Sequence, residues 1–230
     1  MSRAFLPAVD TALIVASLVH RFQERKGTEI PYIIHPVHVA LLLQRSGYDA
    51  ALVTAGLLHD VLEDMEFGNR TLQEDFSDTF PDAALPVMAG AETFRRAFLQ
   101  FMERSFGADV MSLVRAVSEA KNDGEPSRSW TKRKAEQFAR FEAADDWRIF
   151  ALKAADTLHN VQSVLRELRT STSLDVMKKF TAGPRETTEH YLRVARLVAE
   201  RLGDRPLAAE VVAAAIDLDK QVAMLMASDS

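Results

Sequence analysis

The chain has 230 residues, of which 47% are hydrophobic and 27% charged, and its formal net charge is −5. Its length and composition predict a single globular domain over residues 1–230 with a sizeable core. The chain has no cysteine, which excludes disulfides, and no signal-like or membrane-spanning run, so we expect a cytoplasmic protein without membrane contact. The interspersed, mildly acidic charges argue against a nucleic-acid surface, because the phosphate backbone usually binds basic faces.

Apolar residues at the helical period predict a first helix over residues 3–24, which stops ahead of Gly27. Arg25 and Lys26 follow this helix directly. Cations near a helix C-terminus are favourable by about 0.3–1 kcal/mol, so a purely structural role is one interpretation of the pair. The alternative is that both side chains contact a ligand.

The string PYIIHP places His35 before a proline, and proline suits the first turn of a helix. A second helix is therefore predicted over about 36–46. His38 lies about one turn from His35 on a neighbouring face, so it is a rival candidate for any role given to His35. Asp49 is a plausible N-cap for the helix that follows.

The segment GLLHDVLED, residues 56–64, reads as one helix whose apolar residues fall on a single stripe. Four ionisable groups, His59, Asp60, Glu63 and Asp64, are thus carried beside a buried face. Burying unpaired carboxylates costs several kcal/mol or more, so this cluster needs a cation or a hydrogen-bond network. A capped helix end with solvated acids is the simpler alternative.

The middle of the chain, residues 65–106, contains Phe94, Phe98 and Phe101 at helical spacing. Such a stripe is usually core, and a lid or a dimer face is the alternative. Further helices are predicted over residues 108–120 and from Trp130, where three successive cations include Lys134.

The predicted helix from residue 146 to 168 carries Asp156 and Asn160 one turn apart on one face. Another helix starts at Gly183-Pro184 and runs through Tyr191 to Leu202, and a last one follows Pro206. Because every long segment has the period of 3.6 residues, we predict an all-α bundle of about nine to eleven helices.

Four of these side chains form a candidate metal site: His35, His59, Asp60 and Asp156. Two imidazoles and two carboxylates suit a borderline divalent ion such as Mn²⁺, Fe²⁺ or Zn²⁺ better than Ca²⁺, which prefers oxygen ligands. We expect one ion, manganese first, with iron or zinc as alternatives.

The order His…His-Asp…Asp resembles the HD superfamily of metal-dependent phosphohydrolases. The strings RKGT, PYIIHP, LLHDVLEDME and LKAADTLHNV are more closely similar to the (p)ppGpp hydrolase domain of RelA/SpoT-type proteins and their small stand-alone homologues. The resemblance covers roughly residues 9–200, with a poorly matching insertion at about 65–106. It implies an HD-domain helical bundle and selects His35 over His38 as the ligand, leaving His38 to packing or to support of the site.

The resemblance also implies roles for other residues. Glu63 and Asp64 follow Asp60 by about one turn and correspond to the hydrolase signature pair, a general base or water-orienting group. The expected substrate contacts are Arg25, Lys26, Lys134, Asn160 and Tyr191. One departure is Thr157, because many relatives have a basic residue after the ligand Asp, and this puts substrate detail in doubt.

The implied activity is hydrolysis of the 3′-diphosphate of guanosine 3′,5′-bis(diphosphate), giving GDP or GTP and pyrophosphate. Two alternatives stay open: a phosphohydrolase of another phosphorylated nucleotide or cofactor, and a non-catalytic metal- or nucleotide-binding module. A small-molecule nucleotide is the expected partner, and a homo-oligomer is also open. The synthetase half of the long relatives is missing, so the chain is not expected to make (p)ppGpp.

Overall fold

The computed structural model describes residues 7–119 and 130–228, without the side chains of residues 130, 131, 133 and 134. Within these residues the chain forms ten α-helices and two short 3₁₀ helices, and its only β-type pairing is an isolated bridge between Glu24 and Pro31. The prediction of an all-α bundle with nine to eleven helices is confirmed. The division of the chain into a single domain stays a prediction.

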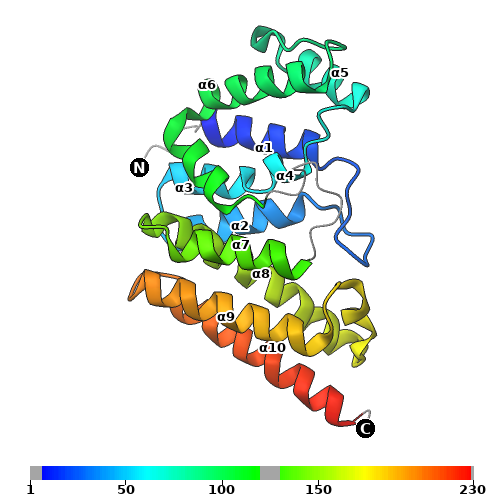
Figure 1. Cartoon of the computed structure of the whole chain (residues 1–230), viewed down its shortest axis with the longest axis vertical. Coiled ribbons are helices and arrows are strands. Elements are labelled where there is room, and N and C mark those ends of the chain that lie inside the picture. Colours follow the sequence, from blue (N-terminus) through cyan, green and yellow to red (C-terminus); the bar gives the residue numbers. More distant parts are fainter. Residues whose placement is uncertain (1–6, 120–129, 229–230) are drawn as a thin grey trace.

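The helices are stacked from α5 and α6 at one end of the molecule to α9 and α10 at the other (Figure 1). Between these ends, α8 packs against α2, α9 and α10, while α3 packs against α1, α2 and α6. The helix bounds are α1 (Pro7–Val19), α2 (Ile34–Arg45), α3 (Ala50–Leu58), α4 (Val61–Asp64), α5 (Arg70–Thr79), α6 (Ala91–Val117), α7 (Trp130–Glu142), α8 (Trp147–Ser171), α9 (Pro184–Leu202) and α10 (Ala208–Ser228), with 3₁₀ helices η1 (Pro81–Ala83) and η2 (Leu174–Lys179).

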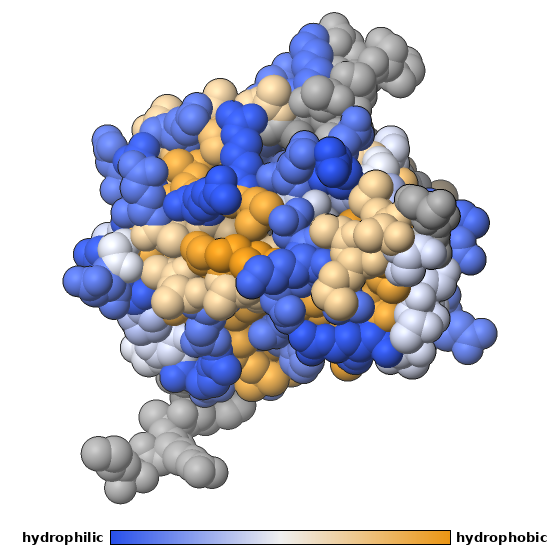
Figure 2. Space-filling model, turned by 90° about the horizontal axis from the view of Figure 1, so that it is seen from below, coloured by the Kyte–Doolittle hydropathy of each residue, from blue (hydrophilic) through white to orange (hydrophobic). Residues whose placement is uncertain are grey.

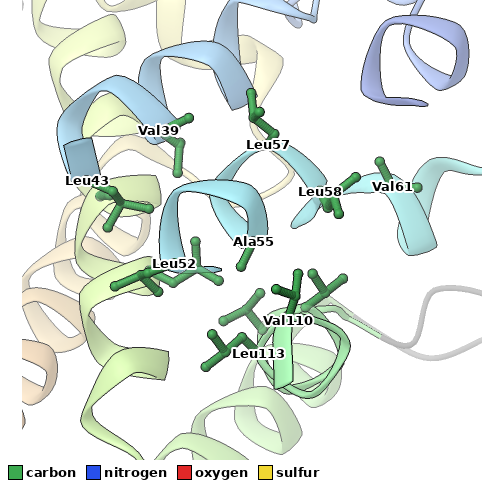
Figure 3. Packing of buried hydrophobic residues seen from close by; sticks show 14 of the residues in the cluster. Val39, Leu43, Leu52, Ala55, Leu57, Leu58, Val61, Val110 and Leu113 are labelled. Atoms are coloured by element: carbon green, nitrogen blue, oxygen red, sulfur yellow. The ribbon is translucent and has the colours of Figure 1, made fainter. Parts of the chain in front are cut away.

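Helix α3 is the centre of the core, and its residues from Leu52 to Leu58 are all buried. Figure 3 shows Leu52 and Ala55 facing Val110 and Leu113 of α6, with α2 on the other side of the helix. The predicted N-cap is confirmed, because the side chain of Asp49 accepts a hydrogen bond from the backbone N–H of Leu52 at 2.9 Å. The cap and the surrounding apolar contacts together fix the position of α3.

Gly56 allows α2 and α3 to approach closely. A Cβ atom at this position would lie 2.8 Å from Leu43 Cδ1 and 3.3 Å from the backbone of Ala40. A side chain there would require Leu43 to move and the backbone of Ala40 to shift by a few tenths of an ångström, so the glycine favours this close spacing. Helix α2 carries His35, and α3 ends directly before His59. The close approach of the two helices therefore brings these histidines together.

The first helix is shorter than predicted, since α1 ends at Val19 rather than near residue 24. After Val19 the backbone turns, and the N–H groups of Arg25 and Tyr32 bond to the carbonyls of Ile30 and Gln23 at 2.7 and 2.8 Å. These bonds across the turn replace the helical ones. Arg25 and Lys26 therefore lie in a loop, not at a helix C-terminus.

The segment 56–64 is not one continuous helix as predicted. Helix α3 ends at Leu58 and α4 begins at Val61, so His59 and Asp60 occupy the junction between them. At the junction the single O–H of Ser118 makes a bifurcated bond, with its oxygen 2.8 Å from the carbonyl oxygen of Val114 and 3.3 Å from that of His59. This bond from a distant part of the chain could not be read from local periodicity.

A phenylalanine cluster fills the end of the molecule formed by α5 and the first half of α6. It consists of Phe76, Phe94, Phe98 and Phe101, all buried, and the rings of Phe76 and Phe98 lie edge to face with centroids 5.1 Å apart. The core role predicted for the phenylalanine stripe is confirmed. Beyond the cluster α6 kinks at Gly107, whose φ of +79° is readily adopted only by glycine.

Seen from below, the surface has apolar residues gathered between strongly hydrophilic ones (Figure 2). Apolar side chains that are well exposed include Met224 and Ile216 of α10, at 68% and 39%. Among the helices that the structure describes, none combines the length and apolar character needed to cross a bilayer. The expectations of a cytoplasmic location, of a homo-oligomer and of no nucleic-acid contact stay predictions.

Candidate functional site

Three buried side chains from different parts of the chain meet at one point. His35 lies in the first turn of α2, His59 at the α3–α4 junction and Asp156 in the middle of α8. His35 Nε2 is 3.2 Å from His59 Nε2 and 3.3 Å from Asp156 Oδ1. One ligand atom from each residue falls within 4.8 Å of the others, so together they could hold a metal ion.

Asp60 completes this group, which we call the polar centre: His35, His59, Asp60 and Asp156. Its Oδ2 atom lies 3.2 Å from His59 Nε2 and 3.5 Å from His35 Nε2, and it accepts a hydrogen bond from the hydroxyl of Tyr32 at 2.8 Å. All four side chains predicted as ligands are therefore brought together. The rival residue, His38, is exposed and packs its ring against His159 instead.

Hydrogen bonds fix the orientation of both imidazoles in the polar centre. His59 Nδ1 donates to the carbonyl oxygen of Gly56 at 2.8 Å, which leaves Nε2 directed at the centre. His35 Nδ1 lies 2.7 Å from His159 Nδ1, so a single proton is shared between them. Burial, with the nearby His35, lowers the pKa of His159 to about 3, so its imidazole is neutral and able to accept a hydrogen bond. Such outer hydrogen bonds typically set the tautomer of ligating histidines.

The carboxylates make the polar centre anionic. Burial alone would raise the pKa of Asp60, but neighbouring His59 and His35 hold it well below its usual range. For Asp156, Lys153 and the two histidines likewise outweigh burial and lower the pKa. Burial alone would lower the pKa of His59, yet the two carboxylates raise it to about 9. The same negative charge that holds a proton on His59 would also attract a metal cation.

Asp156 is held from both sides. Its Oδ2 atom accepts a hydrogen bond from Lys153 Nζ at 2.7 Å, and its Oδ1 atom accepts one from Asn160 Nδ2 at 2.6 Å. Asn160 in turn accepts a hydrogen bond from Arg25 at 2.7 Å. Burial would lower the pKa of Lys153, but Asp156 outweighs burial and raises it, so the ammonium stays charged. Of the predicted residues, Asn160 is thus bonded directly to the polar centre, and Arg25 is joined to it through Asn160.

The two predicted catalytic acids lie in different surroundings. Glu63 lines the cavity at the polar centre, and its Oε1 atom accepts a hydrogen bond from the backbone N–H of Glu119 at 2.5 Å. Asp64 is not among the residues that line this cavity, and its Oδ2 atom lies 3.8 Å from Nδ1 of the buried His20. Of the pair, Glu63 is the acid that faces the space above the polar centre.

Two adjoining cavities lead from the polar centre to the surface. An inner cavity of about 210 Å³ has the four side chains of the centre in its wall, and a larger one of about 320 Å³ includes Lys26 and Tyr191. Both cavities are lined by Glu119, Lys153, Asp156 and Asn160. A neighbouring space of about 220 Å³ is lined by Arg25, Lys26 and Lys179, among others. The arrangement fits an elongated ligand with anionic groups.

The remaining predicted residue, Lys134, lies in α7, but its side chain is outside the described residues. Sequence reasoning missed Lys153, His159 and Tyr32. Lys153 and His159 lie three residues before and after Asp156, which is the spacing of neighbours on one helix face, so the motif itself contained a signal. Nothing in the sequence points to the bond between Tyr32 and Asp60.

Comparison with curated proteins finds relatives that are much longer than this chain. It is 30% identical over 86% of its length to a GTP pyrophosphokinase of Streptomyces coelicolor. It is 32% identical over 70% of its length to a probable guanosine-3′,5′-bis(diphosphate) 3′-pyrophosphohydrolase of Synechocystis, and 32% identical over 66% to the bifunctional (p)ppGpp synthase/hydrolase SpoT of Escherichia coli. The chain spans 18%, 16% and 17% of these relatives, respectively.

Solved structures share the fold. A metazoan ortholog of SpoT, described as hydrolysing ppGpp, matches with a TM-score of 0.58 and 24% identity, over 96% of this chain and 98% of the other. A protein of Listeria monocytogenes EGD-e matches with a TM-score of 0.51 and 24% identity, over 86% of this chain and 99% of the other. The family profile described as HD domain matches residues 12–96 and 83–182. The chain therefore belongs to the HD domain family.

Proposed function

We propose that this chain is a metal-dependent phosphohydrolase that removes the 3′-diphosphate of guanosine 3′,5′-bis(diphosphate), releasing GDP or GTP and pyrophosphate. The observation that carries the proposal is the polar centre, which is buried and anionic. It lies in the wall of the inner cavity, which adjoins a larger cavity lined in part by cationic side chains. The names of the relatives from Synechocystis and Escherichia coli support this choice of substrate.

His35, His59, Asp60 and Asp156 are the residues that would hold the metal ion. Their mixed nitrogen and oxygen donors fit one borderline divalent ion, with manganese our first choice. When bound, such an ion lowers the pKa of a water molecule and screens charge on a phosphoryl group. The hydrogen bonds from Lys153 and Asn160 to Asp156 keep its carboxylate in place for this role.

Glu63 is the proposed general base. In the reaction, the oxygen of water bonds to the inner phosphorus of the 3′-diphosphate, and the bond from this phosphorus to the 3′ oxygen breaks. Glu63 takes one proton from the water and then gives it to the 3′ oxygen, which leaves as a hydroxyl group, so that Glu63 returns to its carboxylate form. The bond from the Glu119 backbone holds Oε1 of Glu63 in the inner cavity. Asp64, one residue further, lies outside the wall of this cavity beside His20, so we propose for it a supporting role and no direct contact with the water.

The substrate would extend from the inner cavity into the larger one. We assign Asn160 to the sugar and Tyr191 to the nucleoside, because both line the larger cavity. Burial raises the pKa of Tyr191 to about 12, so its hydroxyl stays protonated and able to donate. Arg25, Lys26 and Lys134 are assigned to the phosphates, where charge-assisted hydrogen bonds are strongest.

The test is the substitution Glu63→Gln. The amide is nearly isosteric but cannot accept the proton, so we expect kcat to fall about 10²- to 10⁴-fold with metal content and KM little changed. Glu74→Gln, an exposed change in α5, is the matched control and should leave kcat unaltered. Metal content is measured by mass spectrometry, and products are identified by chromatography from a panel of phosphorylated nucleotides with Mn²⁺.

Two outcomes would contradict the proposal. Full turnover by the Glu63→Gln protein would remove Glu63 from the reaction. A wild-type protein that releases no pyrophosphate from (p)ppGpp, but hydrolyses another nucleotide in the panel, would favour the broader phosphohydrolase assignment instead.

A further inference from the structure

Lys153 lies where the inner and larger cavities meet. Its side chain lines both of them, and only 15% of that side chain is exposed. A group that passes from the larger cavity to the polar centre must therefore come close to this ammonium. The bond from Lys153 Nζ to Asp156 Oδ2 uses one of the three N–H donors that an ammonium carries.

The charge around the inner cavity makes Lys153 unusual. Among the described residues in its wall, four carry carboxyl groups, and Lys153 is the only Lys or Arg. A phosphate that entered this space would meet Asp60, Glu63 and Glu119 at close quarters. Without a cation of the protein beside the metal, the repulsion between like charges would oppose its binding.

Thr157 does not supply such a cation. It is buried, it lines the larger cavity, and its hydroxyl carries no charge. Lys153 lies one helical turn before Thr157 on α8 and is held toward the same space by its bond to Asp156. The positive charge at the junction of the cavities therefore comes from Lys153.

We propose that Lys153 binds the diphosphate group that is being removed, and that it also holds Asp156 through Oδ2. The inference rests on the proposed function for the identity of that group. A role confined to Asp156 would require only a hydrogen-bond donor at this position. A role in binding phosphate requires a positive charge, and this difference makes the two roles separable.

The substitution Lys153→Gln separates them, because the amide can still donate to Asp156 but has no charge. Inorganic pyrophosphate is titrated by calorimetry into full-length protein saturated with Mn²⁺, with metal content measured in parallel. We expect Lys153→Gln to keep its metal and to bind pyrophosphate about 10- to 100-fold more weakly than wild type, the usual cost of losing a charged hydrogen-bond partner. Lys178→Gln, an exposed change with the same loss of charge, should bind as wild type.

Lys153→Met serves as a second variant, since it removes both the donor and the charge and should weaken metal binding as well. Unchanged affinity for pyrophosphate in metal-loaded Lys153→Gln would overturn the inference. Loss of metal from Lys153→Gln even at saturating Mn²⁺ would also overturn it, in favour of a role confined to Asp156. A wild-type protein that binds pyrophosphate through Lys153, but releases none from (p)ppGpp, would refute the proposed function and leave this inference standing.

Discussion

The phenylalanine cluster and the polar centre are both buried, yet they are held together in different ways. In the cluster, rings such as Phe76 and Phe98 contact one another without directional bonds, so apolar area and shape are what matter. In the polar centre, each ring or carboxylate is oriented by a specific partner, such as Gly56 for His59 or Lys153 for Asp156. The comparison indicates that the cluster contributes mainly stability, while the centre contributes mainly function.

The largest expected effect comes from breaking the cluster. Phe98→Ala removes a fully buried ring, and we expect it to lower the free energy of unfolding by about 3–5 kcal/mol through lost burial and a cavity. Denaturant unfolding measures this loss. The folded fraction should keep its metal stoichiometry and its KM, because no residue of the cluster touches the polar centre. A variant that is as stable as wild type would show that the cluster relaxes to fill the cavity.

Metal removal should act on the polar centre alone. At a free Mn²⁺ concentration of 100 times Kd, binding stabilises the folded state by about 2.7 kcal/mol, so chelation should lower Tm. The same metal-dependent shift in free energy is expected in Phe98→Ala, because distant sites without shared partners contribute additively. Thermal unfolding with and without chelator provides the measurement. A much smaller shift in Phe98→Ala would mean that the two regions are coupled.

The smallest effect is expected at the support of His35. His159→Ala removes the acceptor for Nδ1 of His35, and loss of such an outer partner typically weakens metal binding about 10- to 100-fold. His38→Ala is the control, because His38 contacts His159 edge to face but makes no described hydrogen bond to His35. Competition with a metallochromic dye gives the affinities. Equal losses in both variants would assign the effect to ring packing and not to the hydrogen bond.

Much of the fold was predictable because it depends on local patterns. Helical periodicity predicted α8 and α9 to within a few residues, and the capping role of Asp49 follows from its position before an apolar segment. The early end of α1 was not predictable, because backbone bonds across the turn from Gln23 to Tyr32 decide it. Local reasoning fails where a contact that is remote in sequence overrides the helix.

The same distinction holds for the candidate site. The four residues of the polar centre were predicted together, since their types and order indicate a metal site. Their partners were harder to predict, because they are distant in sequence. His159 is 124 residues from His35, and Tyr32 is 28 residues from Asp60. Lys153 was within reach, because its spacing from Asp156 is that of helix neighbours. The sequence contained no cue that its ammonium lines two cavities at once.

The interruption between α3 and α4 has a consequence for protein engineering. Successive side chains on an unbroken α-helix diverge by about 100°, because one turn takes 3.6 residues. His59 and Asp60 nevertheless bring Nε2 and Oδ2 to within 3.2 Å of each other beside the same two partners. A designer who transplants this dipeptide onto a straight helix would transfer both residues but not their convergence. The transferable unit is the dipeptide together with the break between the two helices.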